Sequence, residues 1–136
     1  MRVIAGCAGG LPLAVPKTDL RPTMDRVKGA IFDSLGEAIL EARVLDLFAG
    51  SGSLGIEALS RGAASATMVE KEPRAVEVIH RNLKKTRLEA GATVHALDIF
   101  SYLHRLAPAG GFDLILADPP YAKRKDERDF GAELLG

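Results

Sequence analysis

Four short apolar runs, separated by segments with helical periodicity, constrain the fold of this chain more than any other feature. The runs cover residues 43–48, 66–69, 93–97 and 112–117. Apolar strands that alternate with helices along a chain are typical of a parallel sheet with right-handed crossover connections. The pattern therefore predicts an α/β fold built around a parallel sheet.

The segments outside these runs predict four helices. They are expected at about residues 23–40, at 53–61, from 73 onward and around 102–103. Thr23 is a suitable N-cap for the first helix. The periodicity of that helix places four apolar residues on one face, namely Val27, Ala30, Ile31 and Leu35. Residues 1–20 are rich in Gly and Pro and are expected to form an N-terminal arm or loose hairpin outside the core, with residues 21–136 as the α/β domain.

The composition limits the classes of protein to which this chain can belong. At 136 residues it forms one domain, and 18 Lys and Arg balance 18 Asp and Glu, so no global field attracts nucleic acid. The single cysteine, Cys7, and three scattered histidines predict neither a disulfide nor a metal site. No signal-peptide pattern and no apolar run of membrane-spanning length is recognisable. We expect a soluble cytoplasmic protein.

An acidic residue lies at the end of each predicted strand. These residues are Asp46, Glu70, Asp98 and Asp118. Ligands of open α/β sheets bind outside the carboxyl ends of the strands, so we expect the four acids to surround one ligand site. Acids are also common in solvated loops, but each of these terminates an otherwise apolar run.

The fourth strand leads directly into Asp118-Pro119-Pro120-Tyr121. This motif combines rigid hydrogen-bond acceptors with a flat stacking surface, because proline fixes the backbone and lacks an N–H group. Such a cluster suits a planar group that carries an amine, such as a nucleobase, which must be unpaired or flipped out to enter. The alternative is a proline-stiffened turn in which Tyr121 only contributes to packing.

The first strand leads into a glycine-rich loop, Gly50-x-Gly52-x-x-Gly55, which formally matches the dinucleotide fingerprint. A pyrophosphate would approach the helix N-terminus beside Asp46, whose carboxylate would repel it. The same carboxylate suits the ammonium and sulfonium groups of S-adenosylmethionine. Glu70 could then accept hydrogen bonds from ribose hydroxyls, and Asp98 from the adenine amino group. The charge pattern favours S-adenosylmethionine over NAD.

Three stretches of the chain resemble the RsmD-type 16S ribosomal RNA guanine-N2 methyltransferases. They are Leu20-Arg21-Pro22-Thr23-x-Asp25-Arg26-Val27, the run from Asp46 to Ala63, and Asp118-Pro119-Pro120-Tyr121. The resemblance implies a Rossmann-like S-adenosylmethionine methyltransferase fold with strand order 3-2-1-4, which methylates a guanine of small-subunit ribosomal RNA. It implies S-adenosylmethionine as the cofactor, and small-subunit (16S) ribosomal RNA or the assembling small subunit as the partner.

The resemblance also assigns site residues, position by position. The predicted cofactor-binding residues are Asp46, Phe48, Ala49, Gly50, Ser51, Gly52, Glu70, Lys71, Asp98 and Ile99. The predicted catalytic residues, which would hold the target base, are Asp118, Pro119, Pro120 and Tyr121. The predicted substrate-binding residues are Arg21, Arg26, Tyr121 and Lys123. Tyr121 would stack on the base, and the three basic residues are assigned to phosphate contact because they flank the predicted pocket in sequence, with solvated surface as the alternative. No metal ligand is predicted.

The family sheet has seven strands, whereas this chain ends shortly after the fourth. A sheet truncated there would leave strand four with an exposed apolar edge, so self-association through that edge is a further expectation. A shortened chain could also be a non-catalytic remnant that binds cofactor or RNA without turnover. Because motifs of the Asp-Pro-Pro-Tyr type serve several methyltransferase classes, DNA adenine or a protein glutamine remain alternative acceptors.

Overall fold

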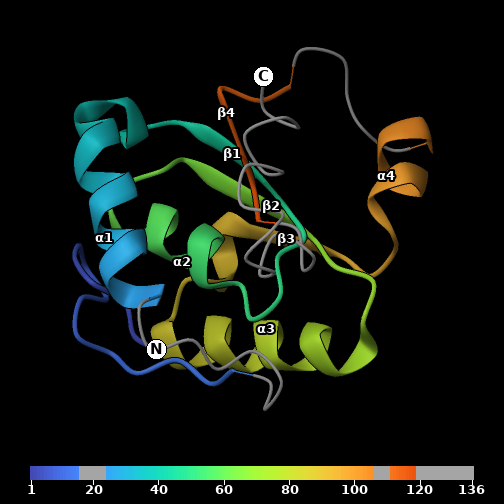
Figure 1. The fold of residues 1–136 in the computed structure, drawn as a ribbon, viewed down its shortest axis with the longest axis horizontal. Helices are drawn as coiled ribbons and strands as arrows, with labels where there is room; N and C mark the ends of the chain where they lie inside the picture. Colours follow the sequence, from blue (N-terminus) through green and yellow to red (C-terminus); the bar gives the residue numbers. More distant parts are fainter. Residues whose placement is uncertain (16–23, 106–110, 119–136) are drawn as a thin grey trace, which may run out of the picture.

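The computed structural model describes residues 1–15, 24–105 and 111–118 (Figure 1). Strands β1 to β4 span Arg43–Leu47, Ser65–Val69, Ala92–His95 and Leu114–Ala117. Helices α1 to α4 span Met24–Leu35, Ser53–Ser60, Pro73–Thr86 and Ile99–Arg105, and the 3-10 helices η2 and η3 span Gly36–Ile39 and Glu89–Gly91. The predicted alternation of strands and helices is confirmed. Thr23, the predicted N-cap, lies outside the described residues, as does the predicted domain boundary at residue 20.

The strands of the described chain form one parallel sheet in the order β3-β2-β1-β4, as predicted. The register pairs Leu47 at the end of β1 with Val69 of β2 and with Ala117 of β4. Val69 is in turn paired with His95 at the end of β3. The carboxyl ends of the strands are therefore level, and the residues that follow them emerge at one edge of the sheet.

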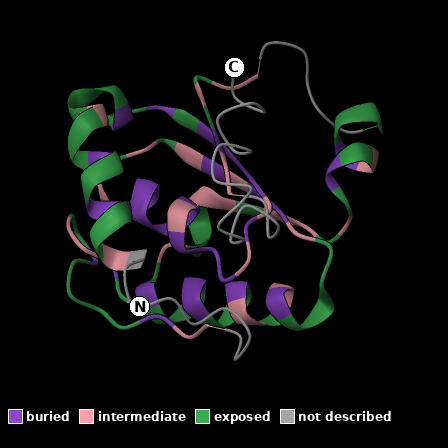
Figure 2. Cartoon of the chain, in the orientation of Figure 1, coloured by how far each residue is buried: buried purple, intermediate pink, exposed green. Residues whose placement is uncertain are grey.

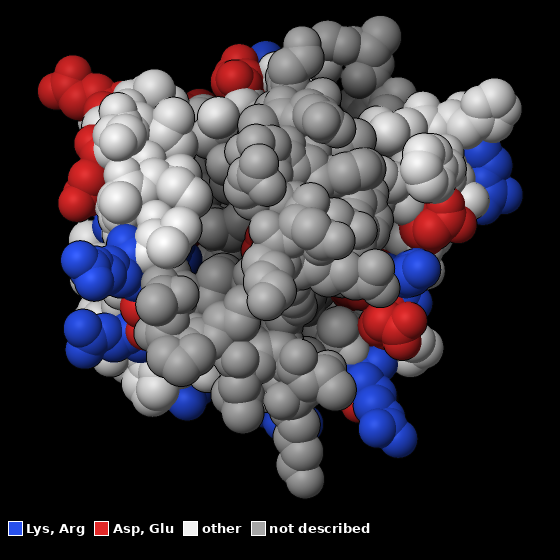
Figure 3. Space-filling view, in the orientation of Figure 1, with Lys and Arg blue, Asp and Glu red and all other residues white. Residues whose placement is uncertain are grey.

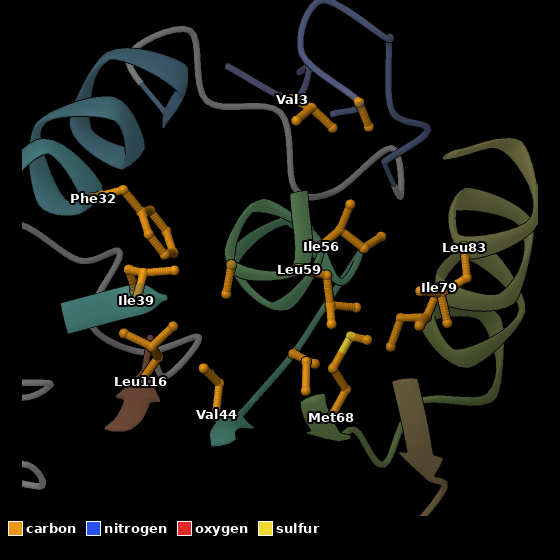
Figure 4. Packing of buried hydrophobic residues seen from close by; sticks show 14 of the residues in the cluster. Val3, Phe32, Ile39, Val44, Ile56, Leu59, Met68, Ile79, Leu83 and Leu116 are labelled. Atoms are coloured by element: carbon orange, nitrogen blue, oxygen red, sulfur yellow. The ribbon is translucent and has the colours of Figure 1, made fainter. Parts of the chain in front are cut away.

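Helices cover both faces of the sheet, and each face has its own apolar cluster (Figure 1). The first cluster joins the sheet to α1, α2 and α3, and its members labelled in Figure 4 are Val3, Phe32, Ile39, Val44, Ile56, Leu59, Met68, Ile79, Leu83 and Leu116. The second joins the sheet to α4 through Leu45, Leu47, Val69, Ile99 and Tyr102. The two clusters follow from the alternation of side chains along a strand, which sends Val44 and Leu45 to opposite faces. Figure 2 shows the buried residues along the central strands, over nearly all of α2 and on one side of α3. Among the helices that the structure describes, none combines the length and the apolar character that crossing a lipid bilayer requires.

Helix α1 buries a different face from the one predicted. Of the four residues on the predicted apolar face, only Leu35 is partly buried, and Val27, Ala30 and Ile31 are exposed. The buried positions include Lys28 and Phe32, at 0% and 1% exposure. The face that is buried is thus displaced by one residue from the predicted one, so that Lys28 and Phe32 lie in the core in place of Val27 and Ile31.

Lys28 can be buried because its ammonium group is fully engaged. Its Nζ donates hydrogen bonds to Ser53 Oγ at 2.8 Å and to the Arg2 carbonyl at 2.5 Å, and it lies 3.5 Å from Glu57 Oε1. Buried charges are tolerated when they are paired and hydrogen-bonded in this way. The orientation of α1 is therefore set by partners distant in sequence, which periodicity does not reveal.

The N-terminal segment (residues 1–15) belongs to the core, whereas the sequence predicted an arm or loose hairpin outside the core. It forms a small hairpin closed by an antiparallel bridge between Arg2 and Pro12. Its buried apolar residues are Val3, Ala8 and Leu13, at 0%, 3% and 6% exposure.

Side chains of α2 satisfy the backbone of the N-terminal segment. The two oxygens of Glu57 accept hydrogen bonds from the N–H groups of Ile4 (2.9 Å) and Ala5 (3.1 Å). Ser60 Oγ accepts a hydrogen bond from Ala8 N–H at 2.9 Å and donates one to the Ala5 carbonyl at 2.6 Å. These bonds give a segment rich in Gly and Pro the partners that its buried backbone needs.

Candidate functional site

Asp46 is the penultimate residue of β1 and is 1% exposed. Its Oδ2 accepts a hydrogen bond from Gly55 N–H, in the first turn of α2, at 3.1 Å. Its Oδ1 is buried and has no hydrogen-bond partner within the described part of the chain. Burial is the main reason that the pKa of Asp46 rises to about 8; the charges of Asp118 and Glu70 also raise it, and the bond from Gly55 opposes the rise. The site therefore holds a buried acceptor that a donor or a cation would satisfy.

The raised pKa changes the charge that Asp46 carries when no ligand is bound. At neutral pH, without a cation beside it, the carboxyl group is mostly protonated rather than permanently negative. A neighbouring positive charge favours the ionised form and lowers the pKa. Asp46 is thus expected to become charged when a cationic ligand arrives, which preserves its suitability for such a ligand.

Glu70 follows β2 and holds the glycine loop (residues 49–52) in place. Its Oε1 accepts a hydrogen bond from Gly50 N–H at 2.7 Å, and its Oε2 accepts one from Glu72 N–H at 2.9 Å. The loop is also tied to β2 by the bond from Ala49 N–H to the Val69 carbonyl, at 3.0 Å. Each carboxylate oxygen can accept more than one hydrogen bond, so Glu70 retains capacity for a pair of hydroxyl groups.

The glycine loop turns sharply between β1 and α2. Gly50 and Gly52 have φ angles of 60° and 82°, and Phe48, just before the loop, has a φ of 58°. Gly52 is the N-cap of α2, and a Cβ there would lie 3.3 Å from the side chains of Ile79 and Met68. Glycine at this position therefore permits both the left-handed turn and the close approach of α3 and β2.

Asp98 and Ile99 follow β3, farther along the same edge. Asp98 caps α4, because its Oδ1 accepts a hydrogen bond from Ser101 N–H at 2.9 Å and its Oδ2 one from Ser101 O–H at 3.0 Å. These bonds lower the pKa of Asp98, which is ionised at neutral pH. The side chain of Ile99 is 7% exposed and packs with Tyr102, whereas Lys71 is exposed.

Asp118 lies directly after β4, beside the end of β1, because Ala117 and Leu47 are register partners. It is partly buried, and its charge acts on Asp46. The rest of the predicted catalytic motif, residues 119–121, lies outside the described residues. The structure therefore brings together Asp46, the glycine loop, Glu70 and Asp118, as the sequence predicted for strand ends.

The structure describes one of the three residues predicted to contact phosphate. Arg26 is exposed on α1, and Arg21 and Lys123 lie outside the described residues. In the view of Figure 3, Lys and Arg side chains lie along the margins of the molecule, interspersed with Asp and Glu. On this face the described Lys and Arg do not gather in one patch, in agreement with the balanced net charge.

Sequence reasoning missed Asn82, a fully buried residue of α3. Its Nδ2 donates hydrogen bonds to the Ser51 carbonyl in the glycine loop (2.9 Å) and to the Ala14 carbonyl (2.8 Å). Its Oδ1 accepts a hydrogen bond from Ala14 N–H at 2.8 Å. The sequence contained one indication of this role: Asn82 is a polar residue on the same helical face as the apolar Ile79 and Leu83.

Comparison with known proteins identifies the family. The family described as Conserved hypothetical protein 95 matches residues 1–132. "Putative rRNA methyltransferase YlbH" of Bacillus subtilis is 45% identical over 127 residues, which cover 92% of this chain and 69% of the relative. Ribosomal RNA small subunit methyltransferase D of Escherichia coli is 39% identical over 125 residues, which cover 90% of this chain and 61% of the relative. The chain belongs to the RsmD-type methyltransferase family.

Solved structures of similar proteins agree with this membership. A hypothetical protein of Thermus thermophilus has a TM-score of 0.80 at 39% identity, covering 99% of this chain and 77% of that one. "Putative methyltransferase yhhF" of Escherichia coli has a TM-score of 0.76 at 37% identity, covering 88% and 64%. The Rossmann-like methyltransferase fold is thus confirmed. The RsmD-type chain spans 61–69% of the length of the two sequence relatives named above.

Membership of this methyltransferase family implies S-adenosylmethionine as the methyl donor. The described residues fit that molecule. Oδ1 of Asp46, which has no hydrogen-bond partner among those residues, can receive a positively charged group. Glu70 can accept hydrogen bonds from two ribose hydroxyls while it holds the glycine loop.

Proposed function

We propose that this protein transfers a methyl group from S-adenosylmethionine to the exocyclic N2 amine of a guanine in small-subunit ribosomal RNA. The supporting observation is the convergence of Asp46 and Asp118 at the ends of two paired strands. In this proposal, Asp46 receives positive charge beside the glycine loop, and Asp118 accepts hydrogen bonds from the amine. The ribosomal RNA methyltransferases among the relatives support RNA as the substrate class.

The residues of the cofactor side bind and orient the methyl donor. S-adenosylmethionine, when bound, supplies a methyl group made electrophilic by its positively charged sulfur. Asp46 binds the positive charge of the methionine portion, and Glu70 fixes the ribose. Asp98 accepts a hydrogen bond from the adenine amino group, for which its ionised carboxylate keeps acceptor capacity beside its bonds to Ser101.

Asp118 acts on the acceptor. The exocyclic amine of guanine is a weak nucleophile because its lone pair is delocalised into the ring. Hydrogen bonds from this amine to the Asp118 carboxylate and to the Pro119 carbonyl favour a tetrahedral nitrogen. Attack then forms the N–C bond and breaks the C–S bond, whose electron pair stays on sulfur, and the amine proton passes to solvent. Holding both partners in line supplies most of the acceleration.

The remaining predicted residues bind the RNA. Tyr121 stacks on the flipped-out base, an interaction of roughly 1–3 kcal/mol in proteins that bind single strands. Arg21, Arg26 and Lys123 contact phosphates, which makes the affinity for RNA fall as salt is raised. Because contacts to phosphate carry no sequence information, the choice of base falls to Asp118 and the residues that follow it.

The proposal is tested by incubating the protein with labelled S-adenosylmethionine and small-subunit RNA from cells that lack the enzyme. Mass spectrometry of the nucleosides is expected to show N2-methylguanosine. The same assay is run with DNA and with a glutamine-containing ribosomal protein as acceptors. Methyladenine or methylglutamine in place of methylguanosine, or binding of S-adenosylmethionine without any transfer, would contradict the proposal.

A further inference from the structure

One buried amide, that of Asn82, bonds to two segments that are far apart in the sequence. Its Nδ2 donates to the carbonyls of Ser51 and Ala14, and its Oδ1 accepts from Ala14 N–H, all within 2.8–2.9 Å. The two carbonyls require donors and the N–H requires an acceptor, so the partners themselves fix the orientation of the amide. A carboxylate, a hydroxyl or an apolar side chain of similar size could not make all three bonds.

On the loop side, Asn82 holds the middle of the glycine loop. Ser51 lies between Gly50, whose N–H is bound by Glu70, and Gly52, whose N–H bonds to the Ala49 carbonyl at 2.8 Å. Ser51 is 3% exposed, so its carbonyl depends on Asn82 for a partner that water cannot readily replace. The loop is thus held from β2 by Glu70 and from α3 by Asn82.

On the other side, Asn82 holds the end of the N-terminal segment. Both backbone groups of Ala14 bond to the amide, and the adjacent Leu13 is 6% exposed and bonds through its N–H to the Met1 carbonyl at 2.9 Å. If the N-terminal segment moves away, the amide loses two of its three partners. An unsatisfied polar group in the core is costly. The amide therefore turns toward other partners, and its remaining bond to the Ser51 carbonyl is weakened as well.

We propose that Asn82 is a positioning residue that couples the N-terminal segment to the glycine loop, so that docking of the segment and binding of the cofactor reinforce each other. This inference rests on the proposed function for the identity of the cofactor. Coupling between two binding equilibria is reciprocal, so whatever docking of the segment adds to cofactor affinity, cofactor binding adds to docking. In this proposal the N-terminal segment contributes to the cofactor site through Asn82 and the glycine loop.

The first arm of the test needs no ligand and measures hydrogen exchange at Gly50 and Gly52. Leu13→Ala loosens the N-terminal segment without altering the loop or the amide. It is expected to speed exchange at both glycines in the natural background and to have no further effect in an Asn82→Ala background. Val3→Ala, a smaller truncation in the same segment, provides a second perturbation of the same kind. An unchanged loop in Leu13→Ala, or equal acceleration in both backgrounds, would overturn the proposal.

The second arm measures the affinity for S-adenosylmethionine by calorimetry. Asn82→Ala is expected to weaken binding by about tenfold, within the usual range of coupling between sites. Thr86→Val is the matched control, since Thr86 is buried on the same helix and its hydroxyl bonds to the Asn82 and Leu83 carbonyls (2.8 and 3.2 Å). This control is expected to bind like the natural protein, and weakening by both variants to the same extent would overturn the proposal.

A replacement variant covers a failure to fold, and two outcomes distinguish this inference from the proposed function. If Asn82→Ala fails to fold, Asn82→Asp replaces it, because aspartate keeps the volume and the acceptor for Ala14 N–H but loses both donors. Coupling in the exchange arm without any uptake of S-adenosylmethionine would refute the proposed cofactor and support the coupling. Normal methyl transfer with a loop indifferent to Leu13→Ala would refute the coupling alone.

Discussion

Lys28 and Glu57 form an ion pair in which Nζ lies 3.5 Å from Oε1 and both side chains are fully buried. The pair joins α1 to α2, but the two partners are unequally supported. Glu57 also bonds to Arg61 at 2.7 Å and to the backbone N–H groups of Ile4 and Ala5. Burial lowers the pKa of Lys28, and the charge of Glu57 opposes that effect. Lys28 thus depends on Glu57 for its charge more than Glu57 depends on Lys28.

We therefore expect Glu57→Ala to destabilise the protein more than Lys28→Met. Removing Glu57 leaves a buried ammonium without its main counter-charge, which costs about 3–5 kcal/mol in comparable pairs. Lys28→Met leaves Glu57 with Arg61 and its two backbone donors, and the thioether side chain fills much of the same space. Urea denaturation measures both free energies of unfolding. An equal loss, or a larger one for Lys28→Met, would contradict this account of α1 docking.

Gly6 and Gly10 provide a matched pair of substitutions in the N-terminal segment. Their φ angles are 87° and 89°, so alanine adds a similar strain of about 1–2 kcal/mol at either position. A Cβ on Gly6 would lie 1.9 Å from the Ser60 carbonyl oxygen, whereas Gly10 has no atom within 4 Å of that position. Gly6→Ala is therefore expected to lower the melting temperature clearly more than Gly10→Ala. Similar melting temperatures would show that the hairpin is not closely seated on α2.

Asp46 is expected to make the stability of the ligand-free protein depend on pH. Its folded pKa of about 8 lies above the ordinary value of 3.8, so between these values the folded state keeps a proton that the unfolded state has lost. The free energy of unfolding attributable to Asp46 therefore falls as the pH rises through that window. Asp46→Asn, which has the same shape and no titration, removes this fall. Parallel pH profiles for the two proteins would refute the raised pKa.

The same group is expected to make cofactor binding depend on pH. A cationic ligand favours the ionised form of Asp46, so binding releases a proton whenever the pH is below about 8. Affinity for S-adenosylmethionine should rise by up to roughly tenfold per pH unit and level off near the pKa. Calorimetry in buffers of different ionisation enthalpy measures the released proton directly. Asp46→Asn should bind weakly at every pH, and a pH-dependent affinity in that variant would place the titrating group elsewhere.

Asp118→Ala is expected to abolish methyl transfer while leaving the affinity for S-adenosylmethionine within a few-fold of the natural value. Asp118 is assigned to the acceptor, so its loss should affect turnover rather than binding of the donor. Asp46→Ala should do the reverse and weaken binding first. Comparing the dissociation constant with the transfer rate in each variant distinguishes the two roles. Loss of cofactor binding in Asp118→Ala would show that this carboxylate supports the cofactor site.

Much of the fold was predictable because local patterns and tertiary packing agree along the strands. The run ending in Leu47 is apolar because it is buried on both faces, and the glycine loop and Glu70 follow strands whose level ends bring them together. Prediction failed where a distant partner decides the outcome. Lys28 is buried because Glu57 lies opposite it, and no periodicity of α1 contains that information.

Dependence on partners distant in sequence also explains which features of the site the sequence did not reveal. Asn82 reads as an ordinary helical asparagine until the Ser51 and Ala14 carbonyls are placed beside it. The charge of Asp46 was inferred from residue type, whereas its pKa depends on complete burial and on neighbouring carboxylates from other strands. Residue type and spacing located the site, and three-dimensional neighbours determined its electrostatics.

The central claim is that the carboxyl edge of β1, β2 and β4 receives a positively charged methyl donor rather than a dinucleotide. The most direct test is a pair of calorimetric titrations of the protein with S-adenosylmethionine and with NAD, each repeated on Asp46→Asn. We predict saturable binding of S-adenosylmethionine that Asp46→Asn weakens, and no measurable binding of NAD. Saturable binding of NAD at this edge, with no binding of S-adenosylmethionine, would contradict the account.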